Sequence, residues 1–442
     1  MPALPSNNRK LLWTAIAATQ WALLMGLGTW LALWWQPAPH SDWGYYWAAA
    51  GDVAAYERGG LSLWLLAVPK ALGWSPVASA LALNLPAATA ALGLAWHVDP
   101  TRWRVFAQLT AAYLLLITPF FGIVQLDLIS AAQLGLGMWL AFGPGLSLPF
   151  RIRLPLAAVA IAFAVSTKPQ YALVVWALVP MALALMILRR GHPRAGASAI
   201  YGVLLAGSLL GFATDMAMRQ ASGRTEQIRT SSAVTLYAGL LVSSDRRDER
   251  CGYWSVAAAQ AARQDLDRSM LVAARDRLSA RPLEHWISVV ACKAPQIVSP
   301  PPYALYWLIE SPNIRARIDT RQDRERLQER YLRALGLEQL AYRALTLTIL
   351  IACGWTAARS RRAAAPPRAW LPVLWILAFW VVHTVFEIQG RYFLGMFLLA
   401  PLLCGLVLRQ VGRRSGPSRA ALRTEPATGG GPQTPKPPAT KV

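Results

Sequence analysis

The sequence predicts an all-α membrane protein with about ten transmembrane helices, and three observations carry this expectation. Of its 442 residues, 55% are hydrophobic and only 15% are charged, a composition unlike that of a soluble domain. Apolar stretches of about 20 residues recur, and each is long enough to cross a hydrocarbon core of about 30 Å. Many of the 20 Trp residues lie near the ends of these stretches, as in the aromatic belts of membrane interfaces.

The predicted spans follow one another with polar loops between them. The first, 11–35, is too long for a secretory signal and has no evident cleavage site, so we interpret it as a retained anchor. The other expected spans lie at 74–96, 105–121, 128–146, 154–167, 170–188, 199–216, 339–357, 369–387 and 392–410. No internal repeat is evident in the sequence, which weakens an inverted-repeat transporter interpretation.

Lys and Arg gather in alternate loops, and this distribution sets the expected orientation. The basic stretches on the expected cytoplasmic side are "NNRK", "HVDPTRWR", "PFRIR", "RRGHPR", "ARSRR" and "VGRRSG". The positive residues behind the net charge of +22 cluster in these short loops and in the tail, so the charge does not indicate nucleic-acid binding. We expect residues 1–10 to form a cytoplasmic N-terminus and 411–442 a disordered basic cytoplasmic tail.

Two regions are expected on the other, extracytoplasmic side. The outer loop 36–73, inside an N-terminal transmembrane module (11–216), is rich in aromatic residues and Ala and is broken by "RGG". This pattern predicts two short helices lying in the membrane interface. The charged segment 217–338 predicts a small, mainly helical extracytoplasmic region before the C-terminal spans (339–410).

One apolar piece of that region, 285–310, is not expected to cross the membrane. It contains Lys293 and three consecutive prolines, Pro300 to Pro302. These residues disfavour a straight helix in contact with lipid, so we expect an interfacial or re-entrant element.

The four Cys residues divide by location. Cys353 and Cys404 fall in predicted spans, where we expect small buried side chains. Cys251 and Cys292 fall in the predicted outer region, and a disulfide between them is one open alternative if that region faces an oxidising compartment.

Ionisable residues within or beside the spans are functional candidates, because charges are costly in a membrane. Asp42 lies in the first outer loop, Asp127 at the start of a span, and Lys168 in the turn between two spans. Glu387 and Arg391 lie in the tight turn between the last two spans. The loop charges place all five on the same extracytoplasmic side.

Each candidate also has a structural interpretation. Ser41 or Asp42 would cap the aromatic helix that follows, and Lys168 and Arg391 would anchor spans at the interface. Asp127 would pair with Lys168. The five His residues share no ligand spacing, so the sequence predicts no cofactor and leaves a need for a divalent metal open.

The gathered charges suit a lipid-linked phosphate substrate. Arg391 and Lys168 would bind the phosphate, and a carboxylate opposite them would take a proton from an acceptor hydroxyl. No nucleotide-binding fingerprint is present in the sequence. This agrees with a donor that is carried by a lipid outside the cytoplasm.

These motifs resemble the GT-C superfamily of integral-membrane glycosyltransferases, which use polyprenyl-phosphate sugars. The stretch "SDWGYYWAAAGDV" is similar to the first-loop pattern of its polyprenyl-phosphate-mannose-dependent members, whose first-loop acid implies Asp42 as the catalytic base. "GIVQLDLISAAQ" and "STKPQYALV" are similar to a span and a Lys-Pro turn of the same relatives. "TLYAGLLVSSDRRDERCGYWS", "KAPQIVSP" and "EIQGRYFLGMFLLAPLL" resemble the branch that modifies proteins and lipid A.

The resemblance covers about 40–405 and implies a glycosyltransferase of the bacterial inner membrane, active in cell-envelope glycan biosynthesis. Its expected partners are a polyprenyl-phosphate-sugar donor, a lipid, glycan or protein acceptor, and membrane lipids. The residues expected at the site are Asp42 as the base and, for substrate binding, Arg391, Lys168, Asp127, Glu387, Tyr392, Tyr46 and Gln125. The first loop has Asp-Trp where protein O-mannosyltransferases have Asp-Glu.

Two other functions stay open at this point. An enzyme of the O-antigen-ligase or polymerase type would take a glycan from a lipid diphosphate, and it would suit the outer-region arginines Arg219, Arg224, Arg229, Arg246, Arg247 and Arg250. A transporter or flippase would instead place ionisable residues at mid-membrane in two matched halves. Here they gather on one face.

Overall fold

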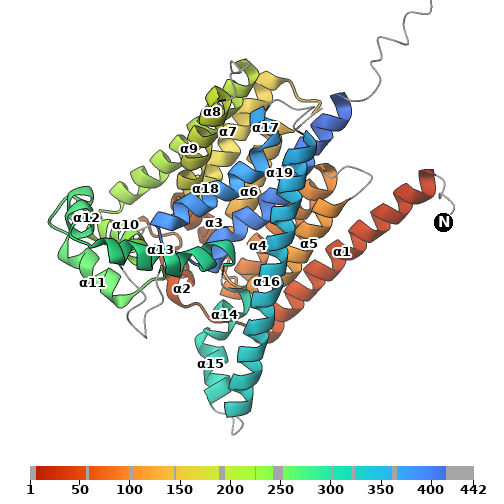
Figure 1. Cartoon of the computed structure of the whole chain (residues 1–442). Coiled ribbons are helices and arrows are strands. Elements are labelled where there is room, and N and C mark those ends of the chain that lie inside the picture. The colour runs from red at the N-terminus through yellow and green to blue at the C-terminus, as the bar shows by residue number, and fades with distance from the viewer. Residues whose placement is uncertain are drawn as a thin grey trace, which may run out of the picture.

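The computed structural model describes residues 6–55, 59–98, 104–143, 146–188, 195–223, 225–241, 252–300, 303–319, 324–360 and 366–414. Within these ranges every regular element is a helix (Figure 1). The all-α prediction is therefore confirmed for the described part of the chain.

The N-terminal half contains nine α-helices and two short 3-10 turns among the described residues. They are α1 (Ser6–Trp35), α2 (Ser41–Ala49), η1 (Val53–Ala55), α3 (Gly60–Ala71), α4 (Pro76–Val98), α5 (Val105–Ile117), η2 (Thr118–Phe120), α6 (Asp127–Phe142), α7 (Phe150–Thr167), α8 (Gln170–Leu188) and α9 (Ala195–Ala221).

The C-terminal half begins with a run of shorter helices and ends with long ones. They are α10 (Thr225–Leu240), α11 (Val256–Gln264), α12 (Met270–Ser279), α13 (Leu283–Val298), α14 (Ala304–Ile309), α15 (Pro312–Asp319), α16 (Arg324–Ser360), α17 (Pro366–Ala369), α18 (Leu371–Val385), η3 (Gly390–Phe393) and α19 (Leu394–Arg414).

Seven of the described helices are long and apolar enough to cross a membrane, which supports the prediction of a membrane protein. They are Leu11–Trp35, Pro76–Val98, Phe150–Thr167, Gln170–Leu188, Ala199–Ala221, Glu329–Ser360 and Gly390–Val411. Three further predicted spans correspond to shorter apolar helices, Val105–Phe120, Asp127–Phe142 and Leu371–Val385. The total of ten spans stays a prediction.

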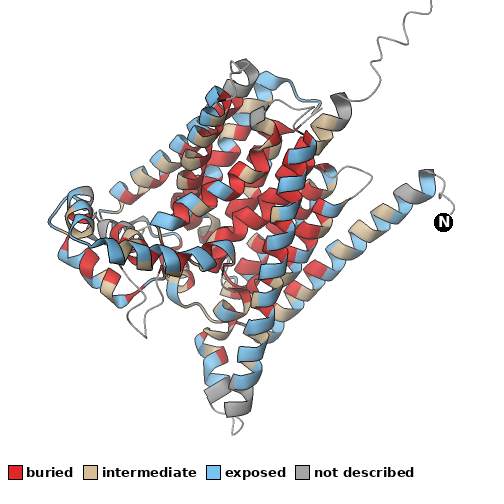
Figure 2. Ribbon diagram, viewed as in Figure 1, coloured by how far each residue is buried: buried red, intermediate tan, exposed pale blue. Residues whose placement is uncertain are grey.

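The core of the bundle lies around α6 and α19. α6 packs against α7, α4 and α19, and Leu399 and Leu402 of α19 lie beside Gly135 of α6. In the apolar part of α19, 89% of residues are buried, against 17% for α1. α1 leans away from the other helices toward its N-terminus (Figure 1). Figure 2 shows the buried residues concentrated in the centre of the bundle.

The two ends of the bundle differ in what they carry. At one end, Arg153 donates to the Gly143 carbonyl (2.8 Å) and Arg409 donates to the His97 carbonyl (2.9 Å). The opposite end carries α2, α3, the run from α10 to α15 and the start of α16 (Figure 1). We call this second end the site end, because the candidate residues gather there.

α13 lies on the site end with two different faces. Val289, Lys293 and Ile297 are buried, whereas Leu283 and Ile287 on the other face are 70% and 60% exposed. A helix whose outward face carries large apolar side chains favours an apolar environment on that face. Segment 285–310 forms most of α13 and all of α14, and neither is among the candidate spans of the described residues.

Two expected boundaries fall inside continuous helices. α9 runs on to Ala221, past the expected boundary at 216, and α16 begins at Arg324, well before the one at 338. Residues 324–338 are rich in Arg, Glu, Gln and Leu, which are strong helix formers whether or not a membrane surrounds them. Of the expected tail 411–442, residues 411–414 belong to α19 and the remainder lies outside the described residues.

The cysteines agree with the expectation where the structure describes them. Cys353 and Cys404 are free and buried, with their Sγ atoms 3.6 Å apart. Cys292 is disulfide-bonded. Cys251 lies outside the described residues.

Candidate functional site

Asp42 lies in the first turn of α2. Two prolines, Pro37 and Pro39, follow α1, and residues without a backbone N–H cannot continue its hydrogen-bond ladder. The N-cap of α2 is His40, whose side chain makes no capping hydrogen bond. The structural interpretation of Ser41 or Asp42 as an N-cap was therefore wrong, and the Asp42 carboxylate is directed to other partners.

Both ends of the segment around Asp42 are held in place. The N–H of Ala38 donates to Ser311 Oγ (2.6 Å) and to Asn313 Oδ1 (3.1 Å), and Asn313 also donates to the Gln36 carbonyl. At the other end of α2, Lys70 donates to the carbonyls of Trp47, Ala48 and Ala50, at 2.9, 3.0 and 3.4 Å. The position of Asp42 is thus set by α3 and by the α14–α15 junction.

Arg391, in η3, is the centre of the site. Its side chain is 2% exposed, and it donates to Asp42 Oδ2 (2.5 Å), to Gln389 Oε1 (2.7 Å) and to Gln125 Oε1. A guanidinium has five N–H groups, and these bonds use three of them. Asp42, by contrast, is 16% exposed, so the pair is open to a ligand from the carboxylate side.

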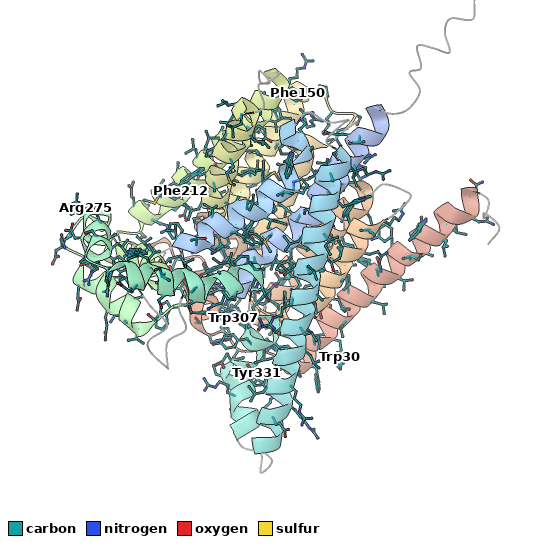
Figure 3. All side chains as sticks on the ribbon, viewed as in Figure 1. Trp30, Phe150, Phe212, Arg275, Trp307 and Tyr331 are labelled. Atoms are coloured by element: carbon teal, nitrogen blue, oxygen red, sulfur yellow. The ribbon has the colours of Figure 1, made fainter. Side chains whose placement is uncertain are left out.

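Aromatic rings lie against the guanidinium of Arg391. Its central carbon lies 4.9 Å from the centre of the Trp307 ring and 5.2 Å from that of Tyr392, distances typical of cation–π contacts. Trp307 belongs to α14 and is labelled in Figure 3. α14 begins where the N–H of Ala304 donates to Glu338 of α16 (3.1 Å), so α16 helps to place the Trp307 ring.

A buried ion pair lies beside this centre. Lys168 Nζ lies 3.2 Å from Asp127 Oδ2, and the two side chains are 7% and 0% exposed. The same Asp127 oxygen lies 4.0 Å from Arg391 Nη1. Lys168 follows α7 and precedes Pro169, which favours extended backbone at Lys168. Its ammonium also lies 5.3 Å from the ring centre of Tyr46.

Gln125 joins the two groups of charges. It is fully buried in the short segment between η2 and α6, where Asn84 donates to the carbonyls of Phe121 (2.9 Å) and Ile123 (3.0 Å). Its Oε1 accepts from Arg391, while its Nε2 has no hydrogen-bond partner. A buried donor without a partner is costly, so this amide nitrogen is suited to a ligand oxygen.

The turn after α18 supplies the remaining residues. Gln389 donates to Glu387 and accepts from Arg391, which makes a continuous path from Glu387 to Asp42. The N–H of Glu387 donates to the Thr235 carbonyl of α10 (3.0 Å). The turn is therefore attached to the helices of the site end.

The structure brings all eight predicted residues together. Five of them form hydrogen bonds or ion pairs with Arg391 or with one another, and one of the five, Glu387, is linked to Arg391 through Gln389. The five are Asp42, Gln125, Asp127, Lys168 and Glu387. Tyr46 and Tyr392 contact the two cations through their rings. Gln389 and Trp307 were not predicted. Gln389 lies in the quoted motif "EIQGRYFL", but Trp307 gave no sequence signal.

The candidate site combines acidic and basic side chains. Asp42 and Asp127 pair with the two cations, Arg391 and Lys168, and Glu387 accepts a hydrogen bond from Gln389. Among the described residues, no group of three or more His, Cys, Asp or Glu could hold a metal ion. Burial lowers the pKa of His40, next to α2, below its ordinary value of 6.5.

A separate groove of about 540 Å³ lies between α4 and α6. Its wall includes Leu83, Leu94, Ile129 and Leu136, and it is almost entirely apolar. Ile129 and Leu136 lie on the opposite face of α6 from Asp127, given about 3.6 residues per turn. The groove is therefore separate from the charged site.

The sequence and structure were also compared with known proteins. No protein-family model, no curated protein and no solved structure matches this chain.

Proposed function

We propose that this protein is a membrane glycosyltransferase of the GT-C type that moves a sugar from a polyprenyl-phosphate donor to a lipid, glycan or protein acceptor. The observation that carries the proposal is the contact between the Asp42 carboxylate and the Arg391 guanidinium, beside the Lys168–Asp127 pair. A partly exposed carboxylate next to buried cations combines a proton acceptor with a phosphate site.

The donor phosphate would bind to the cations. Arg391 would offer its remaining N–H groups as a fork and Lys168 a point charge. The unpartnered Nε2 of Gln125 would donate to a phosphate or sugar oxygen. The cations also stabilise the negative charge that grows on the phosphate as the sugar leaves.

Asp42 would act as the general base in the transfer. The bond between the anomeric carbon and the phosphate oxygen breaks, and its electron pair stays with the lipid phosphate. A new bond forms between that carbon and the acceptor oxygen, and the hydroxyl proton passes to the Asp42 carboxylate. No atom beyond donor, acceptor and protein is required.

We place the site on the extracytoplasmic face of a bacterial inner membrane, with both chain ends in the cytoplasm. Arg153 and Arg409 lie at the opposite end from the site, as expected for cytoplasmic loops. The disulfide at Cys292 supports an oxidising compartment for the site end. In this arrangement the three shorter apolar helices also cross, which gives ten spans.

The location of the charges favours an enzyme over a transporter. Transport through a central site would need ionisable groups near mid-membrane, and the cluster instead lies at helix ends: Asp127 starts α6, Lys168 follows α7 and Arg391 precedes α19. An enzyme of the O-antigen-ligase type would differ in its donor, which would be a glycan on a lipid diphosphate.

The decisive experiment compares surface glycolipids, glycans and glycoproteins by mass spectrometry, in cells with and without the protein. We expect one sugar to be lost from one carrier. Membranes carrying Asp42→Asn should then show transfer reduced by at least about 100-fold, in line with the loss of a general base.

Asp52→Asn is the matched control. Asp52 lies in the same loop, is exposed, and bonds only locally to the N–H of Ala54 (2.9 Å) in the described structure. It should leave transfer unchanged. If Asp42→Asn showed wild-type transfer at normal expression, the base assignment would be refuted. If the mass-spectrometric comparison showed loss of an entire glycan chain, the ligase type would be favoured.

A further inference from the structure

A buried lysine outside the charged site makes an unusual set of bonds. Lys293 of α13 is 1% exposed. Its Nζ donates to the carbonyls of Gly239 (2.9 Å), Thr384 (2.8 Å) and Phe386 (3.0 Å). An ammonium has three N–H donors, so the three carbonyls match a charged lysine.

These carbonyls belong to two parts of the site end. Gly239 lies near the end of α10, whereas Thr384 and Phe386 end α18 and begin the turn that leads to Arg391. The Lys293 ammonium therefore joins α13, α10 and the start of this turn. We call residues 386–391 the Arg391 turn.

Three further contacts fix the same place. The N–H groups of Glu387 and Ile388 donate to the carbonyls of Thr235 (3.0 Å) and Gly252 (2.5 Å). At Gly239 the backbones approach so closely that a Cβ would overlap the Val385 carbonyl oxygen. The Arg391 turn is thus attached to the helices of the site end by backbone contacts and by one buried cation.

Burying the Lys293 ammonium to attach this turn costs free energy of hydration. The ion pairs of the described residues include none with Lys293, so no carboxylate among these residues offsets its loss of hydration. Burial lowers the pKa of Lys293 from its ordinary 10.5 to about 7. An apolar side chain would avoid this loss of hydration but would leave the three carbonyls without their donor, which indicates that the three bonds themselves serve the protein.

We propose that Lys293 is a positioning residue for Arg391: its buried ammonium holds the Arg391 turn in the geometry that keeps the guanidinium on Asp42 and Gln125. The inference rests on the proposed function only in the last step, where the ordered turn binds a lipid phosphate. The ordering of the turn can be measured without any assumption about the reaction.

The proposal also gives the turn a pH dependence. A neutral amine has two N–H groups, so one of the three carbonyls loses its donor when Lys293 is deprotonated. The titratable neighbours are His383 of α18, whose Nδ1 lies 2.8 Å from the Glu387 carbonyl oxygen, and Glu387 of the turn, whose carboxylate accepts from Gln389. On α13 itself, His285 faces the Leu240 carbonyl (2.8 Å).

Hydrogen exchange in the full-length protein in nanodiscs tests the ordering step. Lys293→Met should speed exchange in the Arg391 turn by at least about fivefold, as expected when hydrogen bonds that close a segment are lost. In the wild type, openings of this turn that leave Lys293 buried should become easier as the pH rises through about 7, because the neutral amine has one N–H fewer for the three carbonyls. For these local openings, protection of the turn relative to α6 should fall, whereas global unfolding, which hydrates Lys293, should become harder. The variant should lack this pH dependence.

Lys70→Met is the matched control, because Lys70 also donates to three carbonyls. Its acceptors end α2 and form no hydrogen bond with the Arg391 turn in the described part of the chain. It should therefore speed exchange in α2 and leave the Arg391 turn as protected as in the wild type. A fall in protection of this turn in both variants would indicate general loosening and would overturn the proposal.

Binding of undecaprenyl phosphate, followed by native mass spectrometry, tests the link to Arg391. We expect Lys293→Met to weaken binding by about tenfold, because a disordered turn must be ordered again when the ligand binds. Faster exchange with unchanged binding would show that Lys293 does not act through Arg391.

The failures of the two proposals are distinguishable. If wild-type protein binds no undecaprenyl phosphate, the proposed donor class is wrong, and the exchange data alone then decide whether Lys293 orders the turn. Equal protection of the turn in wild type and Lys293→Met would overturn the inference even if the enzyme were active. The wild-type pH series gives the same decision if the variant does not fold.

Discussion

The Arg391 guanidinium donates a 2.5 Å hydrogen bond to the Asp42 carboxylate, although 349 positions separate the two residues in the chain. The bond joins the first loop of the protein to its last turn. In the proposed reaction the same cation that binds the phosphate also orients the base. A change at either residue should therefore affect both binding and chemistry.

Arg391→Lys should reduce kcat/KM for the lipid-phosphate donor by about 100-fold, comparable to the loss of one donor from an oxyanion hole. Lysine keeps the charge but lacks the planar fork, which now reaches Asp42, Gln125 and Gln389. The measurement is steady-state transfer in nanodiscs. Arg409→Lys is the control. Arg409 lies at the other end of α19 and donates to the His97 carbonyl, so this substitution should leave the rate unchanged. Equal effects of the two substitutions would contradict the assigned role.

The buried pair of Asp127 and Lys168 should show strong coupling in a double-mutant cycle. Either Asp127→Asn or Lys168→Met leaves a buried charge without its nearest partner, which costs about 3–5 kcal/mol. The double variant should lose less than the sum of the single losses, because neither charge remains unpaired. Denaturation in detergent measures the three free energies. Additive losses would mean that the pair makes no net interaction.

Two glycines should respond in opposite directions to alanine. In Gly239→Ala the new Cβ would overlap the Val385 carbonyl oxygen, and overpacking of this kind costs about 1–3 kcal/mol. Gly354→Ala adds a Cβ in open space on the exposed face of α16, and helix propensity should add about 0.5–1 kcal/mol of stability. Thermal denaturation compares them. A neutral Gly239→Ala would show that α10 is not closely packed against the end of α18.

The pH dependence of stability should reveal Lys293. Its pKa is about 7 in the folded protein, against 10.5 for an ordinary lysine side chain, so between these values the unfolded chain binds more protons. The free energy of unfolding should therefore rise with pH in this window, by at most about 1.4 kcal/mol per pH unit. In Lys293→Met this contribution should be absent. A constant difference between wild type and variant from pH 7 to 10 would rule out the shifted pKa.

The composition of the site could be predicted because charge is expensive in apolar surroundings. Asp127 and Lys168 lie beside predicted membrane spans, where ionisable residues are rare unless they have a function. The loop charges assign them to the same side of the membrane as Asp42 and Arg391. The sequence does not show which cation pairs with which carboxylate. Nothing in it shows that Arg391 bonds to Asp42 while Lys168 takes Asp127, because that choice depends on how η3 sits between α2 and α6.

Other contacts depend wholly on tertiary structure. Lys293 indicated only that 285–310 should not span, whereas its three carbonyl partners come from α10, α18 and the turn beyond. Ser41 has a good capping side chain, yet the N-cap is His40, because the bonds from Ala38 to Ser311 and Asn313 fix the path of the chain before α2. At both Lys293 and Ser41, contacts with residues far away in the sequence outweigh the preference of the local sequence.

The unbroken α16 has a mechanical consequence. Its 37 residues make a rod about 55 Å long, well beyond the thickness of a hydrocarbon core. Glu338 on this rod holds the first residue of α14, whose Trp307 lies on Arg391. In the proposed orientation, one end of α16 would lie in the membrane and the other in water. If the proposed function holds, an acceptor that displaced the outer end of α16 would also shift α14 and its Trp307 relative to the Arg391 guanidinium.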